Sequence, residues 1–144
     1  MRLYFGHPVN SYDTDLERWI IAEIERLIPG SVVENPNQPH HQEGYKKYER
    51  AMKDGMRYFL HVVLKKCHGG VVLPFGDGYL GAGIFRETTA LLEAGKPVWA
   101  IRPEHLANRD LRFQELHWDG EILALTVPET RARLRGPDGV RPYA

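Results

Sequence analysis

The sequence predicts a single α/β domain built on a five-stranded, mostly parallel and doubly wound sheet. Short runs rich in β-forming residues alternate with longer segments of helical periodicity, which is the order expected of a parallel sheet with crossover helices. One run, GGVVLPF at 69–75, is apolar on both faces, as strands covered by helices on both sides usually are. The length of 144 residues fits one domain.

The first strand and the first helix are clearly marked. Residues 2–6 (RLYFG) are expected to form a first, central strand. Apolar residues then recur at helical spacing from Leu16 to Ile28. Ser11, Asp13 and Thr14 are candidate N-cap residues of this helix, and Glu17 lies three positions after Thr14.

A second strand, a loop and a long helical segment are expected next. The strand is 31–34. Residues 35–44 (NPNQPHHQEG) are polar and contain two prolines, which predicts a loop long enough to have a function. Residues 45–64 keep helical spacing with a break signal at Gly55, so one kinked helix and two consecutive helices both fit.

A glycine-rich turn at 76–83 follows the third strand. It is expected to lead into a helix from about 83 to 94, for which Gly95 is well placed as the C-cap. A fourth strand is expected at 97–101 and a short helix at 103–110.

The last part of the chain is expected to complete the sheet and then leave it. Residues 121–127 (EILALTV) are the predicted fifth strand. The Asp119-Gly120 pair before it is a strong hairpin signal, so 112–118 is a candidate extra antiparallel strand. The domain is therefore assigned to residues 1–127. Residues 128–144 are expected to form an extended C-terminal tail, solvated or draped over a partner subunit.

The composition excludes several classes of protein. Lys plus Arg and Asp plus Glu number 19 each, so the chain lacks the large positive field needed for duplex nucleic acid or an anionic membrane surface. No run approaches 18 uninterrupted apolar residues, so no membrane span is expected. The lone cysteine, Cys67, cannot form an internal disulfide, and a cytoplasmic location is expected.

Three loops, at 6–13, 35–44 and 76–83, should meet at one edge of the sheet, because ligands of such sheets bind outside the carboxyl ends of the strands. Glycines in the last of these allow a ligand close to the backbone, and the following helix N-terminus offers free N–H groups. Glu87 lies about one turn into that helix and is the candidate site residue. The helix dipole should keep its carboxylate ionised. A surface glutamate that only complements the dipole is the alternative.

The stretch GAGIFRETTALLEAGKPV resembles the signature of the nucleoside 2-deoxyribosyltransferase-like superfamily. In that superfamily a glycine lies four residues before a catalytic glutamate, and lysine-proline-valine begins nine residues after it. Gly83, Glu87 and KPV at 96–98 keep these spacings. The run YFGHP at 4–8 is similar to the superfamily's first strand, although His7 stands where a glycine is usual. The resemblance covers about residues 2–127.

The resemblance implies a Rossmann-like fold and an activity on N-glycosidic bonds. Glu87 would be the catalytic nucleophile that attacks the anomeric carbon of a nucleoside, forming a glycosyl-enzyme ester that a second base or water resolves. Carried over by position, Tyr4, Gly6, His7 and Pro8 would line the pocket for base and sugar. Relatives of this kind are commonly homodimers or larger homo-oligomers.

The chain departs from the superfamily pattern in two places. Gly81 stands where an aspartate is frequent, and no aspartate precedes the third strand. Asp77 is a candidate to supply the missing polar group, Tyr79 to stack on a base, and Gly83 to contact the substrate. Apart from His7, the loop HPVNSYDTD has no basic residue, which disfavours a 5′-monophosphate.

A second resemblance concerns the same region. The stretch LPFGDGYLGAGIFRE is similar to the proline-glycine-glycine and glutamate motif of nucleoside-monophosphate phosphoribohydrolases of the lysine-decarboxylase-like group, although Phe75 replaces the first glycine. Both kinds of relative cleave N-glycosidic bonds, and both belong to a wider set with nucleotide-sensing members.

Other reactive residues have simpler interpretations. His40, His41 and Glu43 fit no standard zinc pattern and are expected to be exposed, so no metal site is predicted. Cys67 is expected to be a buried thiol. Tyr45 and Tyr48 could stack on a base, but their helical spacing with Met52 favours core packing. No residue requires a cofactor such as a flavin.

Three functions remain open at this stage. The first is an enzyme that transfers or hydrolyses the glycosyl group of a nucleoside or related N-glycoside, with Glu87 as nucleophile. The second is a sensor that binds a nucleoside or nucleotide without turnover. The third is an oligomeric domain with a vestigial pocket.

Overall fold

The computed structural model describes residues 1–135 of the chain. Its five strands form one sheet in the order β2-β1-β3-β4-β5. Their bounds are β1 Arg2–Gly6, β2 Val32–Glu34, β3 Gly69–Val72, β4 Val98–Ile101 and β5 Phe113–Leu116. The first four strands run parallel, and β5 pairs with β4 in the antiparallel direction. The predicted α/β class with a mostly parallel sheet is confirmed.

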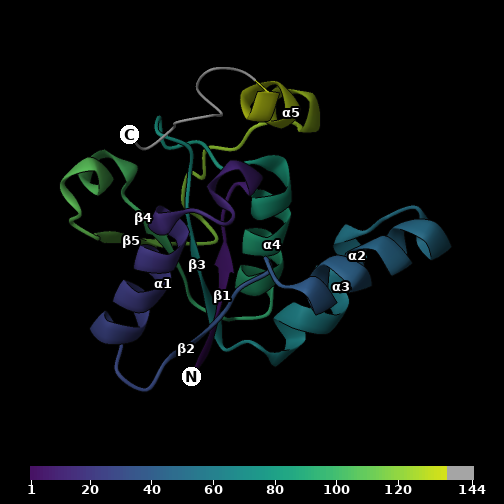
Figure 1. The fold of residues 1–144 in the computed structure, drawn as a ribbon, viewed down its shortest axis with the longest axis horizontal. Helices are drawn as coiled ribbons and strands as arrows, with labels where there is room; N and C mark the ends of the chain where they lie inside the picture. The colour runs from purple at the N-terminus through teal and green to yellow at the C-terminus, as the bar shows by residue number, and fades with distance from the viewer. Residues whose placement is uncertain (136–144) are drawn as a thin grey trace.

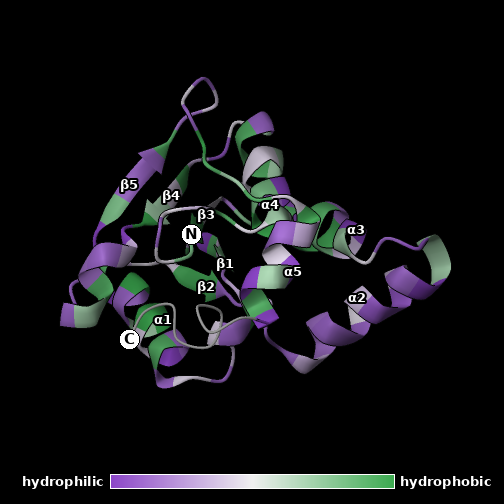
Figure 2. Cartoon of the chain, turned by 90° about the horizontal axis from the view of Figure 1, so that it is seen from above, coloured by the Kyte–Doolittle hydropathy of each residue, from purple (hydrophilic) through white to green (hydrophobic). Residues whose placement is uncertain are grey.

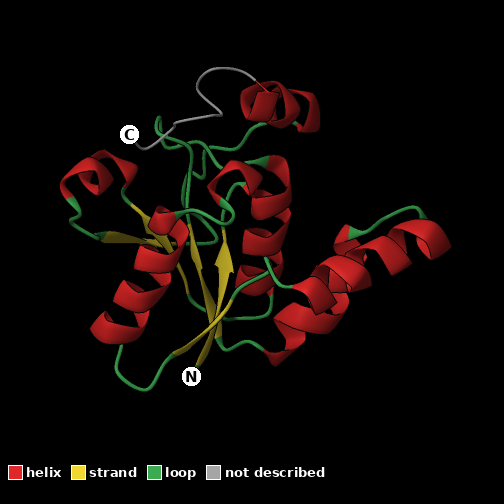
Figure 3. Ribbon diagram, viewed as in Figure 1, coloured by secondary structure: helices red, strands yellow, loops and turns green. Residues whose placement is uncertain are grey.

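Helices cover both faces of this sheet (Figures 1 and 3). The α-helices are α1 Asp15–Leu27, α2 Pro39–Met52, α3 Met56–Tyr58, α4 Ala82–Glu93 and α5 Val127–Arg135. A π-helix, η2 Phe59–Val63, continues α3, and short 3-10 helices lie at η1 Val9–Ser11, η3 Leu64–Lys66 and η4 Pro103–Asn108. In the described part of the chain, no helix is long and apolar enough to cross a bilayer.

The two faces of β1 belong to two different hydrophobic clusters. On one face, Leu3 and Phe5 belong to a cluster with Ile20 and Ile24 of α1. On the other face, Tyr4 belongs to a cluster with Phe59 and with Ile84 and Leu91 of α4. This division follows from the period of two along a strand. It directs Tyr4 towards α4, the helix that carries Glu87.

Helix α1 begins at one of the three candidate N-cap residues. Thr14 is its N-cap residue, and its hydroxyl accepts a hydrogen bond from the Glu17 N–H at 3.1 Å. The Glu17 side chain does not complete a capping box on Thr14, because it binds His7, Asn37 and the Asp13 N–H instead. Glu17, which stands where a capping box would have its acidic residue, therefore contacts residues of the site described below.

The predicted loop at 35–44 is shorter than expected. Gln38 is the N-cap residue of α2, and Pro39 occupies its first turn, where proline needs no hydrogen-bonded N–H and its fixed φ suits a helix. Only residues 35–38 remain a loop, so His40, His41 and Glu43 lie on a helix. The proline that suggested a loop is in fact a helix start signal.

Helices α2, α3 and η2 form an arm that projects from the sheet (Figure 1). The chain turns back at Lys53, which has a left-handed backbone with φ of 55°, so two consecutive helical segments are present. Gly44 and Gly55 permit the close packing of the two segments, since a Cβ at either position would meet the ring of Tyr58 or Tyr45 within 2.6 Å. Figure 2 shows that α2 is mainly hydrophilic, whereas the centre of the sheet is hydrophobic.

Two expectations for the C-terminal region are wrong. Residues 121–127 do not form a fifth strand, because both edges of β4 are already occupied by β3 and β5; only Leu80 and Ala124 form an isolated parallel bridge. The fifth strand is β5, within the candidate antiparallel segment 112–118.

The tail is also not extended from residue 128. Residues 127–135 form α5, which packs near the start of α4: the Thr130 hydroxyl accepts a hydrogen bond from the Ala82 N–H at 2.9 Å. Arg131 and Arg135 are exposed, whereas Arg133 is held by Asp77. The rest of the tail, including Arg141, lies outside the described residues.

Candidate functional site

A cavity of about 330 Å³ opens at the carboxyl end of β1, between α4 and the projecting arm. Its walls come from the segment after β1, the segment after β2, the start of α4 and the inner side of the arm. The strand order reverses here, because β2 and β3 lie on opposite sides of β1. In open α/β sheets this is the usual place for a ligand.

Twelve residues line this cavity. They are Tyr4, His7, Val9, Tyr12, Pro36, Gln42, Tyr45, Met56, Phe59, Gly83, Ile84 and Glu87. Four of the residues predicted from the sequence, namely Tyr4, His7, Gly83 and Glu87, are therefore brought together.

Glu87 is the buried acidic group of the cavity. Only 4% of the residue is exposed, and the Tyr4 hydroxyl donates a short hydrogen bond to its Oε2. Its Oε1 lies close to Gly6, where a Cβ would come within 3.5 Å of this oxygen. Gly6 therefore leaves space for the carboxyl group, although Gly6 itself is not part of the cavity lining.

Burial raises the pKa of Glu87 to about 8, against the opposing effects of the Tyr4 hydrogen bond and the nearby Arg86. Burial therefore opposes the ionisation that the helix dipole was expected to maintain. Glu87 lies past the first turn of α4, where the dipole weakens, and loss of solvation outweighs it. The alternative of a surface glutamate is wrong, because only 4% of Glu87 is exposed.

Tyr4 is a permanent donor to Glu87. Burial, followed by the proximity of Glu87, raises the pKa of Tyr4 well above its ordinary value. The phenol keeps its proton, and this proton points at the glutamate. One oxygen of Glu87 is thus occupied and the other has no hydrogen-bond partner within residues 1–135.

His7 is the centre of a buried polar network below the cavity. Its Nδ1 lies 2.8 Å from the Phe5 carbonyl oxygen, which can only accept, so Nδ1 carries a proton. Its Nε2 lies 2.7 Å from Oε2 of Glu17, and the His7 side chain is fully buried. Both ring nitrogens therefore lie within hydrogen-bond distance of an oxygen.

Glu17 joins two loops that border the cavity. It accepts hydrogen bonds from His7, from the Asn37 side chain at 3.1 Å and from the Asp13 N–H at 3.2 Å. Although burial opposes ionisation, the hydrogen bond from His7, its charge and the hydrogen bond from Asn37 lower the pKa of Glu17. The resulting ion pair ties the segment after β1 to the segment after β2.

Tyr12 is a cavity residue that the sequence reasoning missed. Its ring lies 4.7 Å from the His7 ring, and its hydroxyl has no hydrogen-bond partner within residues 1–135. Burial, with smaller effects from Glu87 and Glu17, raises the pKa of Tyr12, so its proton is retained. The 6–13 loop was expected at the site, but nothing in its sequence singled out this tyrosine.

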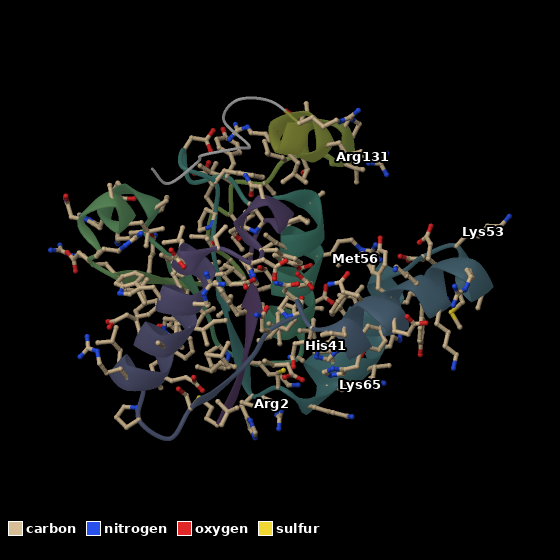
Figure 4. The ribbon with its side chains drawn as sticks, in the orientation of Figure 1. Arg2, His41, Lys53, Met56, Lys65 and Arg131 are labelled. Atoms are coloured by element: carbon tan, nitrogen blue, oxygen red, sulfur yellow. The ribbon has the colours of Figure 1, made fainter. Side chains whose placement is uncertain are left out.

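The arm supplies the apolar wall through Tyr45, Met56 and Phe59. Figure 4 shows Met56 on the side of the arm facing the body, with Lys53 at the far tip. Helical spacing made Tyr45 a candidate core residue; it is partly buried and also lines the cavity. Gln42 lies beside it, with its amide nitrogen bound to the Pro36 carbonyl at 3.1 Å.

Besides Gly6, three of the predicted substrate-binding residues do not line the cavity. Asp77 is 2.8 Å from the Arg133 guanidinium, and this hydrogen bond is the main reason that the pKa of Asp77 is lowered. Tyr79 follows it in the same turn, away from the cavity lining. Pro8 is buried, and its carbonyl accepts from the Ser11 hydroxyl and N–H.

The remaining reactive residues have structural roles. His41 is buried, contrary to expectation, and binds the Tyr58 hydroxyl at 2.7 Å and Glu34 at 3.3 Å. Cys67 is the expected buried thiol, and burial raises its pKa to about 11. Within residues 1–135 no group of histidine, cysteine and acidic side chains is arranged to hold a metal ion.

Lys96 of the KPV run also has a structural role. Its ammonium group donates to the Leu64 carbonyl oxygen at 3.0 Å and so ties the end of α4 to the base of the arm. Lys96 is not among the residues that line the cavity.

Comparison of the chain with models of protein families, with curated proteins and with solved structures found no match.

Proposed function

We propose that the protein cleaves or transfers the N-glycosidic bond of a nucleoside or a related small molecule, with Glu87 as the nucleophile. The observation that carries this proposal is the buried Glu87 carboxyl group at the cavity, with Oε2 held by Tyr4 and Oε1 unpaired within residues 1–135. The spacing of Gly83, Glu87 and residues 96–98, which resembles the deoxyribosyltransferase-like signature, supports the same reaction.

The reaction requires the ionised form of Glu87. Its unpaired oxygen attacks the anomeric carbon, the bond to the base breaks with its electron pair on the leaving nitrogen, and a glycosyl ester forms. Water or a second base then releases the sugar from the ester. The Tyr4 hydrogen bond fixes the carboxylate orientation and favours ionisation.

Base release from a panel of ribonucleosides and deoxynucleosides tests the proposal. We expect free base from at least one member and its loss in Glu87→Gln, which keeps the size and the hydrogen bond to Tyr4. Glu93→Gln is the matched control, since Glu93 is an exposed residue at the end of the same helix. Equal activity in Glu87→Gln would overturn the role of Glu87.

A sensor that binds a nucleoside or nucleotide without turnover is the second candidate. The raised pKa of Glu87 favours it, because a protonated carboxylic acid is a poor nucleophile but a good hydrogen-bond donor to a ligand. Binding of panel members by calorimetry without base release from any of them would support the sensor and refute the enzyme.

The resemblance also implies a homodimer or larger assembly. Light scattering on the purified protein tests this, and a single species with the mass of one 16.5 kDa chain would contradict it.

A further inference from the structure

The cavity has few proton donors that a ligand could use. The Tyr4 hydroxyl is bound to Glu87, both His7 nitrogens are bound to Phe5 and Glu17, and one of the two Gln42 amide protons is bound to Pro36. The Tyr12 hydroxyl is free of a partner within residues 1–135, but burial raises its pKa, so it is too weak an acid to protonate a leaving base. Among residues 1–135, no lysine or arginine lines the cavity. A neutral nucleobase normally leaves only when it is protonated, and no group here is placed as an acid of suitable strength for that step.

The cavity is instead rich in aromatic rings. Tyr4, Tyr12, Tyr45 and Phe59 all line it, and they come from β1, the loop after β1 and both segments of the arm. The Phe59 ring centroid lies 6.2 Å from that of Tyr4 and 6.2 Å from that of Tyr45, so the three form a continuous wall. Aromatic faces attract organic cations, most strongly where water is excluded.

The charge balance of the cavity also favours a cation. His7 and Glu17 neutralise one another, and Arg86 is directed to Asp54, with guanidinium–carboxylate distances of 3.3 and 3.4 Å. Glu87 thus lacks a cationic partner that contacts it. A positive ligand beside Glu87 would offset the cost of burial and stabilise the carboxylate.

We propose that the cavity takes N-glycosides whose leaving group is positively charged, such as an N-ribosyl pyridinium or an N7-alkylated purine nucleoside. This inference rests on the proposed function. It explains why the cavity around Glu87 is aromatic and poor in acids. The positive charge of the substrate favours the ionised form of Glu87, which releases its proton to solvent. The leaving base is then neutral and needs no proton from the protein.

The step balances without a further reactant. The Glu87 carboxylate forms a C–O bond to the anomeric carbon while the C–N bond breaks, and its electron pair neutralises the cationic nitrogen of the base. Water then attacks the anomeric carbon of the ester, which yields the free sugar, the regenerated carboxylate and one proton. The neutral base leaves intact.

Nicotinamide riboside carries a positively charged pyridinium ring, and its dihydro form has the same sugar and amide on a reduced, uncharged ring. The pair therefore tests the effect of charge at nearly constant shape. We expect cleavage and calorimetric binding of the cation, with kcat/KM about tenfold or more above that of the dihydro form. 7-Methylguanosine and guanosine form a second pair with the same expectation. Release is followed by chromatography and corrected for enzyme-free hydrolysis.

The outcomes distinguish this inference from the proposed function. Cleavage of neutral nucleosides with equal or lower efficiency on their cationic partners overturns the charge preference and leaves the proposed function standing. Cleavage of no member of either pair or of the nucleoside panel overturns both.

Variants of Tyr45 test the aromatic wall. We expect Tyr45→Leu to weaken binding of nicotinamide riboside roughly 3- to 30-fold and Tyr45→Phe to retain it, since only the ring face is needed. Tyr48→Leu is the control on the same helix, because Tyr48 does not line the cavity. Thermal melting of each variant confirms folding. Equal losses in Tyr45→Phe and Tyr45→Leu would show that the hydroxyl, not the ring, binds the ligand and would overturn the role of the wall.

Discussion

The hydroxyl of Tyr4 donates a hydrogen bond to Oε2 of Glu87, and the two residues are 83 positions apart in the chain. Both side chains are buried, so neither can exchange this partner for water. The bond joins β1 to α4 at the floor of the cavity. It also opposes the effect of burial on the pKa of Glu87, so one contact affects both the stability of the fold and the ionisation of the candidate nucleophile.

Replacing Tyr4 with phenylalanine tests this contact. Tyr4→Phe leaves Oε2 of Glu87 buried without its donor, and we expect the free energy of unfolding to fall by about 1–3 kcal/mol, measured in urea at pH 6. The pKa of Glu87 should rise further, because a hydrogen bond that lowers it is lost. Tyr48→Phe, on the exposed arm, is the control and should change stability by less than about 0.5 kcal/mol. A similar loss in both variants would contradict the role of the bond.

The pH dependence of stability should reveal the buried carboxyl group. The pKa of Glu87 is raised from an ordinary value of 4.5 to about 8, so the folded state binds this proton more tightly than the unfolded state does. The associated stability is fully present below pH 4.5 and is lost as the pH rises through 8. We expect Glu87→Gln to lack this loss and to gain up to about 5 kcal/mol relative to the parent between pH 5 and pH 9.

Denaturant unfolding of both proteins across that range measures the difference. Glu93→Gln should follow the parent curve, because Glu93 is exposed. Parallel curves for Glu87→Gln and the parent would mean that Glu87 has an ordinary pKa in the folded protein.

The pH dependence of turnover separates two chemical roles of Glu87. A nucleophile must be ionised, so kcat/KM for base release should rise tenfold per pH unit below the pKa of about 8 and level off above it. A general acid would show the opposite, with activity falling above pH 8. Measurement with a nucleoside whose own groups do not titrate between pH 6 and 9 decides between them.

The general plan of the fold could be predicted from the sequence because it depends on local periodicity. The alternation of strand and helix patterns placed β1 to β4 and α1 and α4 close to their observed positions. That residues 113–116, and not 121–127, form the fifth strand could not be predicted from local sequence, because both segments have β-forming residues. The two differ in a long-range contact: 113–116 pair with β4, whereas 121–127 make only an isolated bridge to Leu80.

The candidate site could be predicted where it depends on backbone position and not where it depends on side-chain partners. Glu87 follows from the helix that begins at the carboxyl end of the sheet, whereas Tyr4 and His7 were predicted from the resemblance of residues 4–8 to the superfamily's first strand; all three line the cavity. Asp77 lies outside the cavity lining and binds Arg133, which comes from a segment expected to be extended, so this partner could not be predicted from the sequence. Phe59 and Met56 were missed because their helical spacing is the same for a core helix and for a cavity wall.

The contact between α5 and α4 should matter for stability but not for the cavity. The Thr130 hydroxyl accepts from the Ala82 N–H, which is otherwise an unpaired donor at the start of α4. We expect Thr130→Val to lower the free energy of unfolding by about 1 kcal/mol, as the loss of a helix cap does, and to leave ligand affinity unchanged. Calorimetry with the best ligand of the panel checks the second part; a large loss of affinity would mean that α5 shapes the site.

The ion pair between His7 and Glu17 should be the most costly polar contact to break. Glu17→Ala leaves the His7 imidazole buried without its partner and frees Asn37, so we expect the free energy of unfolding at pH 7 to fall by about 3 kcal/mol. Arg18→Ala is the control on the same helix; it removes an exposed pair with Asp15 and should cost less than about 0.5 kcal/mol.

The pKa of Glu17 lies below its ordinary value of 4.5, so its contribution to stability is present above that pH and lost as the pH falls through the lowered value. The difference between the parent and Glu17→Ala should therefore shrink in acid, and a difference that stays constant from pH 7 to pH 3 would show that the loss is one of packing and not of charge.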